Sequence, residues 1–283
     1  MRFLLVILVA CSAVTNAADG TEFIRVTEDD QGQPLALQLA IASYAPGNGA
    51  SDVRVDLVSA IHIGDEEYYE ELNDRFKAYD ALLYELIAPK GATVADRDSE
   101  HKGVISSTQI TMKNMLELSF QLEEVDYAAS NFVHADLSPT ELSQSMDERG
   151  ESLYVYFWRV FYASMNQYAK DPLGLNEMQK FSAMLSSDSD NALKTMLAYE
   201  MTDLDTHREI LGNDADSAVI GARNQRAIDV LRSQLDSGAR RVAIFYGVAH
   251  MPDMEERLLE QFDLSYLDST WVDAWRLDTQ ADK

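Results

Sequence analysis

A change in hydrophobic period between residues 53 and 87 constrains the fold more than any other feature of this sequence. Residues 53–61 (VRVDLVSAI) form an apolar, β-rich run. In residues 65–79 (DEEYYEELNDRFKAY) the apolar and aromatic positions recur every three or four residues, which predicts a helix. Residues 81–87 (ALLYELI) are again a short apolar run of the buried-strand type. Strand, helix and strand in succession predict a βαβ unit, whose two strands are parallel.

Further β-rich runs lie near both ends of the chain, and the middle is mainly helical in pattern. Residues 23–26 and 35–44 predict a hairpin, and a polar loop containing Gly32 and Pro34 joins its strands. Ser138 followed by Pro139 predicts the start of a helix. The remaining strands are expected at 131–135, 240–246 and 264–277, and the remaining helices at 107–127, 151–168, 175–185, 191–201, 218–235 and 253–262.

This pattern predicts an α/β fold. We expect a mixed, partly parallel sheet built from both ends of the chain, with a helical insertion in the middle. The insertion covers about residues 138–217, and residues 18–283 form a single domain.

The first 17 residues have the pattern of a secretory leader. Met1 and Arg2 precede an apolar run at 3–10, which is about half of the ~20 residues that a membrane-spanning helix needs. Small residues follow, and we expect cleavage after Ala17, which predicts a periplasmic or extracellular protein. The alternative is a lipoprotein anchored through Cys11, because Leu8-Val9-Ala10-Cys11 resembles a lipobox.

Composition excludes several classes of function. The chain carries 23 Lys and Arg against 48 Asp and Glu, a formal charge of −25, which disfavours binding to nucleic acid or to an anionic membrane surface. Cys11 is the only cysteine, so the mature protein has no disulfide and no thiol nucleophile.

Three polar residues stand where predicted strands end. His62 follows the run at 53–61, Glu85 is the one charge in ALLYELI, and His250 follows the run at 240–246. Ligands of open α/β sheets bind beyond the carboxyl ends of the strands, so these side chains are expected to converge there. Two imidazoles and a carboxylate can bind a divalent metal ion, and a metal-bound water can attack a carbonyl.

Other interpretations of these residues remain open. Without a metal, the same groups could act as general base and orienting acid. A histidine at a strand end is often only structural, whereas burying an unpaired Glu85 would cost several kcal/mol. Arg223 begins an amphipathic helix, where it is either a surface arginine or a group that binds a carboxylate or an oxyanion. His101 and His207 lie in polar segments and are expected to be solvated, and His134 is intermediate.

Three segments together resemble the TraB/GumN family, which includes the PrgY and Tiki proteins. They are AIHIGDEEYYEELNDRFKAYDALLYELI, IGARNQRAIDVL and VAIFYGVAHMPDMEERLL, between residues 53 and 262. The family pattern is a first GxxH, a glutamate on the next strand, an ERN-like arginine on a late helix and a second GxxH. By resemblance, the proposed active-site residues of the family correspond to His62, Glu85, Arg223 and His250, and Gly247 is the second motif's glycine.

The chain departs from this pattern at two positions. Ser59 stands where the first motif has glycine, and Ala222 stands where an acid precedes the arginine, which removes one partner for Arg223. The resemblance implies a mixed α/β fold related to the erythromycin-esterase and ChaN-like proteins, and metal-dependent proteolysis is attributed to the Tiki members.

These observations predict an exported, metal-dependent hydrolase of peptide or ester bonds. His62, Glu85 and His250 would hold Mn²⁺, Co²⁺ or Zn²⁺, and Arg223 would stabilise the oxyanion. In a variant of this scheme Glu85 is the general base, and only the histidines and water hold the metal. The alternative function is a non-catalytic protein that sequesters a peptide, haem or another small ligand in the same pocket.

Overall fold

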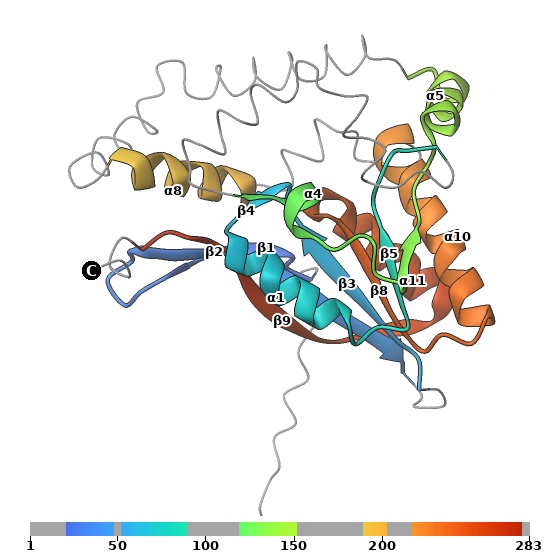
Figure 1. The fold of residues 1–283 in the computed structure, drawn as a ribbon, viewed down its shortest axis with the longest axis horizontal. Coiled ribbons are helices and arrows are strands. Elements are labelled where there is room, and N and C mark those ends of the chain that lie inside the picture. The colour runs from blue at the N-terminus through green and yellow to red at the C-terminus, as the bar shows by residue number, and fades with distance from the viewer. Residues whose placement is uncertain (1–20, 48–51, 90–118, 152–188, 203–216, 279–283) are drawn as a thin grey trace, which may run out of the picture.

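The computed structural model of the chain describes residues 21–47, 52–89, 119–151, 189–202 and 217–278, which are drawn as ribbons in Figure 1. The expected leader with Cys11, the expected helices at 151–168 and 175–185, and residues His101 and His207 lie outside these ranges. Within the described residues no helix is both long and apolar enough to span a bilayer.

A mixed sheet of seven strands forms the centre of the protein, as the sequence predicts (Figure 1). The strand order is β1-β2-β3-β8-β5-β7, and β9 also pairs with β2. The strands are β1 (Ile24–Glu28), β2 (Pro34–Pro46), β3 (Arg54–Ala60), β5 (Ala81–Tyr84), β7 (Phe132–His134), β8 (Arg241–Gly247) and β9 (Leu264–Arg276).

One half of the sheet is parallel. β3 pairs with β8, β8 with β5, and β5 with β7, each in parallel. The strands of the predicted βαβ unit, β3 and β5, are therefore parallel, but β8 lies between them. Residues Val242 to Tyr246 of β8 are fully buried, as expected for a central strand that is covered on both faces.

The other half is antiparallel and is organised by the long strand β2. β1 and β2 form the predicted hairpin, and β3 pairs with residues 41–44 of β2. β9 pairs with residues 36–46 of β2, which include residues paired with β1 and with β3. Since a strand has only two edges, β1 and β3 must lie one after the other along the same edge of β2, and β9 occupies the other edge. The order β1-β2-β3 thus names pairing partners and does not place β2 between β1 and β3.

Helices cover both faces of the sheet. Phe76 of α1 (Glu66–Phe76) packs on Phe245 of β8, with ring centroids 5.0 Å apart. The next residue, Tyr246, points to the opposite face, where its ring lies 5.3 Å from that of His250. α10 (Arg223–Asp236) packs on β5 and β8, and α11 (Met251–Phe262) packs on β3 and β9.

Two further helices lie within the predicted insertion, and two short helical segments precede α10 and α11. α5 (Pro139–Glu148) begins at Ser138 with a capping box to Glu141, which confirms the predicted helix start. A short π-helix, η1 (Ala218–Ala222), leads into α10, and a short 3₁₀-helix, η2 (Val248–His250), leads into α11. α8 (Ser189–Thr202) confirms the helix expected at 191–201.

Two predictions about local structure are wrong in detail. β5 ends at Tyr84, so Glu85 lies just beyond the strand rather than inside it. In the described part of the helix expected at 107–127, β6 (Ser119–Phe120) pairs with β4 (Ile63–Gly64) and only α4 (Gln121–Glu124) is helical. Backbone pairing with β4 overrides the helical period of this segment.

Candidate functional site

The carboxyl ends of the four parallel strands bring the site residues to one edge of the sheet. His62 follows β3, Glu85 follows β5, and η2 with His250 follows β8. Asp136 follows β7, and Arg223 reaches this edge from the start of α10. The structure thus groups Glu85, Arg223 and His250 as the sequence predicts and adds Asp136 to them.

The Glu85 carboxylate accepts hydrogen bonds on both oxygens. Arg223 Nη2 donates to Oε1 at 2.6 Å, and the Gly247 backbone N–H donates to Oε2 at 2.7 Å. Glycine permits this approach, because a Cβ at position 247 would lie only 3.3 Å from Oε2. Burial acts to raise the pKa of Glu85, but His250, Arg223 and the Gly247 N–H outweigh it and lower this pKa to about 2.

Arg223 is buried between two carboxylates. Its Nε and Nη2 donate to the two oxygens of Asp136 at 2.9 and 2.7 Å, a bidentate pair, and Nη2 also contacts Glu85. Burial acts to lower the pKa of Arg223, but the two carboxylates raise it above its ordinary value. Arg223 is therefore not a surface residue, and Asp136 supplies a partner for it despite the neutral residue at position 222.

Asn224 fixes the tautomer of His250. Its Nδ2 donates to the His250 carbonyl at 3.1 Å and to Asp253 Oδ2 at 2.7 Å, so its Oδ1 must accept the hydrogen bond from His250 Nδ1, at 2.6 Å. His250 Nε2 is then unprotonated and lies 3.5 Å from Arg223 Nη1 and 3.7 Å from Glu85 Oε1. Burial lowers the pKa of His250 to about 4, although Glu85 opposes the shift, so the ring is neutral at pH 7.

His62 differs from His250 in being exposed. Its carbonyl accepts the backbone N–H of Gln121 at 3.0 Å, and its imidazole has no hydrogen bond to another residue in the described ranges. Electrostatic interaction with His62 contributes to the low pKa of Glu85, so the two side chains lie near each other. The third predicted ligand is therefore close to the site but is not bonded to it.

The donor groups suit a divalent cation in chemistry, although they do not surround one point. His250 presents an unprotonated nitrogen, Glu85 is ionised, and the imidazole of His62 is accessible, as ligands of such an ion must be. Among the residues that the structure describes, no group of three or more His, Cys, Asp and Glu side chains is already arranged to hold a metal ion. Metal binding would have to bring the exposed His62 toward Glu85 and His250.

His134 has a structural role. Its Nε2 donates to the Leu86 carbonyl at 2.6 Å, and its ring packs 5.7 Å from Tyr84. This bond connects β7 to the segment after β5.

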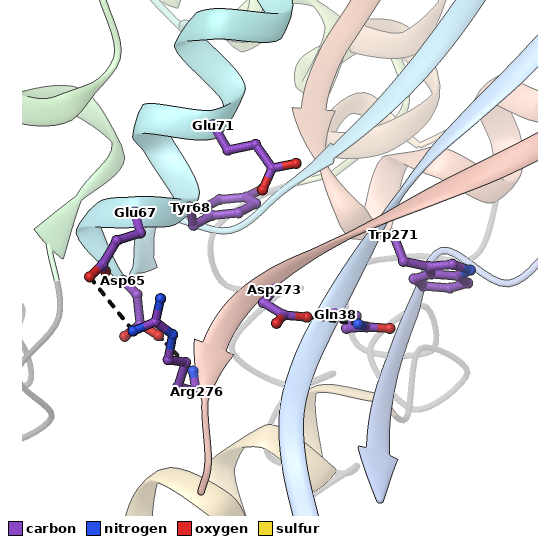
Figure 2. Close-up of a pocket in the computed structure, with 8 residues that line it drawn as sticks. All are labelled: Gln38, Asp65, Glu67, Tyr68, Glu71, Trp271, Asp273 and Arg276. Carbon is purple, nitrogen blue, oxygen red and sulfur yellow. Dashed lines mark hydrogen bonds and ion pairs between the residues drawn. The ribbon is translucent and has the colours of Figure 1, made fainter. Parts of the chain in front are cut away.

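A pocket of about 370 Å³ lies elsewhere, between α1 and β9 (Figure 2). It is lined by Gln38, Asp65, Glu67, Tyr68, Glu71, Trp271, Asp273 and Arg276. Arg276 Nη1 lies 3.7 Å from Glu67 Oε1, and Asp273 accepts a hydrogen bond from Gln38 at 2.7 Å. None of the predicted site residues lines this pocket.

Asp136 and Asn224 are not among the residues predicted from the sequence. Asp136 follows the run FVHA directly, so its position after a strand was a usable signal. Asn224 gave no comparable signal, because a polar residue in the first turn of a helix is ordinary. Comparison with known proteins found no matching family model and no matching curated protein.

Proposed function

We propose that this protein is an exported, metal-dependent hydrolase of peptide or ester bonds, related to the TraB/GumN family. The observation that carries the proposal is the excess of buried negative charge where four parallel strands end. Support for the family comes from the three sequence segments, whose His62, Glu85, Arg223 and His250 belong to one edge of the sheet.

Charge balance favours a cation at this edge. The side chains of Asp136, Arg223 and Glu85 are 0%, 8% and 15% exposed, so two carboxylates face one guanidinium. His250 is neutral, which leaves the group with a net charge of −1. Because unbalanced buried charge is costly, a cation beside Glu85 and His250 would offset that cost.

His62, Glu85 and His250 are the residues that would hold the ion. A divalent metal ion bound there would lower the pKa of a bound water and polarise the substrate carbonyl. Asn224 keeps His250 Nε2 free of a proton, and Arg223 with Gly247 fixes the orientation of Glu85. A carboxylate with a pKa of about 2 is a weak base at neutral pH, which favours the ligand role of Glu85 over that of general base.

The reaction adds water across the scissile bond. The water oxygen joins the carbonyl carbon, the C–N or C–O bond breaks, and the proton from water leaves on the amine or alcohol. The alternative, a sequestering protein, receives no specific support from these contacts. A haem ligand role for His250 is disfavoured because this side chain is buried beside Arg223.

Metal content is the first test. We expect about one Mn²⁺, Co²⁺ or Zn²⁺ per chain in purified or reconstituted protein, and its loss in the His62→Ala/His250→Ala double variant. His134→Ala is the matched control, because His134 bonds to a backbone carbonyl outside the proposed ligand set. Wild-type protein without metal after incubation with all three ions would contradict the proposal.

Turnover is the second test. Peptide and ester panels should be hydrolysed by wild-type protein and not by Glu85→Gln, which keeps the shape of the side chain and removes its charge. Saturable binding of these compounds without product would favour the sequestering alternative.

A further inference from the structure

Hydrolysis of a peptide or ester needs a hydrogen-bond donor for the oxyanion that forms on the carbonyl oxygen. Arg223 was expected in this role, but its Nε and Nη2 already bond to Asp136 and Glu85, and the side chain is buried. To reach an oxyanion, Arg223 would have to turn Nη1, its remaining donor group, away from the buried His250 Nε2, which lies 3.5 Å from it. The donor should therefore be another residue at this edge of the sheet.

Tyr127 lies near this edge and is only half buried. Its ring packs against that of Tyr84, the residue before Glu85, at a centroid distance of 5.2 Å. Its hydroxyl accepts a hydrogen bond from Gln121 Nε2 at 2.8 Å. The backbone N–H of Gln121 in turn donates to the carbonyl of His62. Tyr127 is thus connected to the segments that carry both His62 and Glu85.

The Gln121–Tyr127 pair has an unused hydrogen-bond donor. Because the Tyr127 hydroxyl accepts from Gln121, its own proton is available, and no described residue accepts it. Gln121 is 5% exposed, and its Oε1 is one of two buried side-chain atoms without a partner in the described residues. If the amide were turned over, Oε1 would accept from Tyr127 and the Nε2 protons would be unused instead. In both orientations the pair retains a donor for an acceptor oxygen.

We infer that Tyr127 donates a hydrogen bond to the substrate oxyanion and that Gln121 is the positioning residue for its hydroxyl. This inference rests on the proposed hydrolase function and identifies a residue of that same site. The phenol keeps its proton at neutral pH, because burial and the charge of Glu85 raise the pKa of Tyr127 against the opposing effect of the Gln121 hydrogen bond. An uncharged donor is also compatible with the cation that the charge balance favours.

The test compares Tyr127→Phe with Tyr79→Phe. Tyr79 is a matched control, since it is also half buried and its hydroxyl donates a hydrogen bond to Asp56 at 2.7 Å. It lies at the other end of the sheet, because the N–H of the next residue, Asp80, bonds to the carbonyl of Arg241 at the start of β8. The substrates are N-acetylated hexapeptide amides and their ester analogues. We expect Tyr127→Phe to lower kcat about 100-fold with little change in KM, as loss of one oxyanion donor does, and Tyr79→Phe to leave both unchanged.

The positioning role of Gln121 has a separate readout. Gln121→Met should lower kcat less than Tyr127→Phe does, and it should cause no further loss in the Tyr127→Phe background, because the two residues act through one hydroxyl. Additive losses in the double variant would overturn the role assigned to Gln121.

Binding of hexapeptide phosphinates, whose tetrahedral oxyanion resembles the intermediate, separates failure of this inference from failure of the proposed function. Weaker phosphinate binding by Tyr127→Phe in a protein without turnover would support the donor and contradict the hydrolase. Hydrolysis by wild-type protein with equal kcat in Tyr127→Phe and Tyr79→Phe would overturn the donor alone. Neither hydrolysis nor phosphinate binding by wild-type protein would overturn both.

Discussion

Removing Asp136 should destabilise the protein more than removing any surface carboxylate. The Asp136 side chain is fully buried and accepts two hydrogen bonds from Arg223, at 2.9 and 2.7 Å. Hydrogen bonds to charged groups contribute about 1.5–3 kcal/mol each, and removing one partner of a buried ion pair costs about 3–5 kcal/mol. We therefore expect Asp136→Ala to lower the free energy of unfolding by about 4 kcal/mol, and Tm by about 10 °C.

Urea unfolding followed by circular dichroism measures this change, with Asp74→Ala as the control. Asp74 pairs with Lys77, but their side chains are 80% and 74% exposed, so its removal should cause no measurable loss. In the Arg223→Ala background, Asp136→Ala should cost far less than in wild-type protein, because its partner is already absent. Equal stability of Asp136→Ala and wild-type protein, or full additivity in the double variant, would refute the structural role of this ion pair.

Two further predictions concern His250. Its pKa is about 4 in the folded protein, against an ordinary value of 6.5. Between these pH values the unfolded chain binds more protons than the folded protein does. The free energy of unfolding should therefore fall by about 3 kcal/mol from pH 6.5 to pH 4. Glu85, with a pKa of about 2 against 4.5, adds a second loss below pH 4.5. Unfolding of metal-free wild-type and His250→Gln protein across pH 2–7 separates the two losses, and a flat wild-type profile would contradict both. Asn224→Leu should weaken metal binding about 10- to 100-fold, because it removes the hydrogen-bond acceptor for His250 Nδ1. Competition with a chelator measures this loss, and Gln225→Leu, one residue further along α10, is the control.

Much of this architecture could be predicted from the sequence because local patterns determine it. The change of period between residues 53 and 87 identified β3, α1 and β5, although Glu85, expected within the last of these strands, lies just beyond its end. His62 and His250 were found by the same reasoning, since polar residues that follow apolar strands gather at one edge of a sheet.

The contacts between distant segments could not be predicted in this way. No local pattern indicates that β8 lies between β3 and β5, because strand order depends on pairing between residues nearly 200 positions apart. Asp136 directly follows the strand expected at 131–135, but its partner Arg223 is 87 residues away, and no local pattern indicates that the two side chains pair. The tautomer of His250 depends on Asn224, whose role is visible only once α10 packs beside η2.

The position of β8 also determines when the proposed site can assemble. Because β8 and η2 come from residues 241–250, a chain that ends before them leaves β3 and β5 without their common neighbour. Gly247, which orients Glu85, and His250 would both be absent from such a chain. Folding therefore waits for contacts between distant segments, which slows the search for the native state. A truncated product would carry Glu85 and Arg223 without Gly247 and His250, so assembly of the proposed site is coupled to synthesis of residues 241–250.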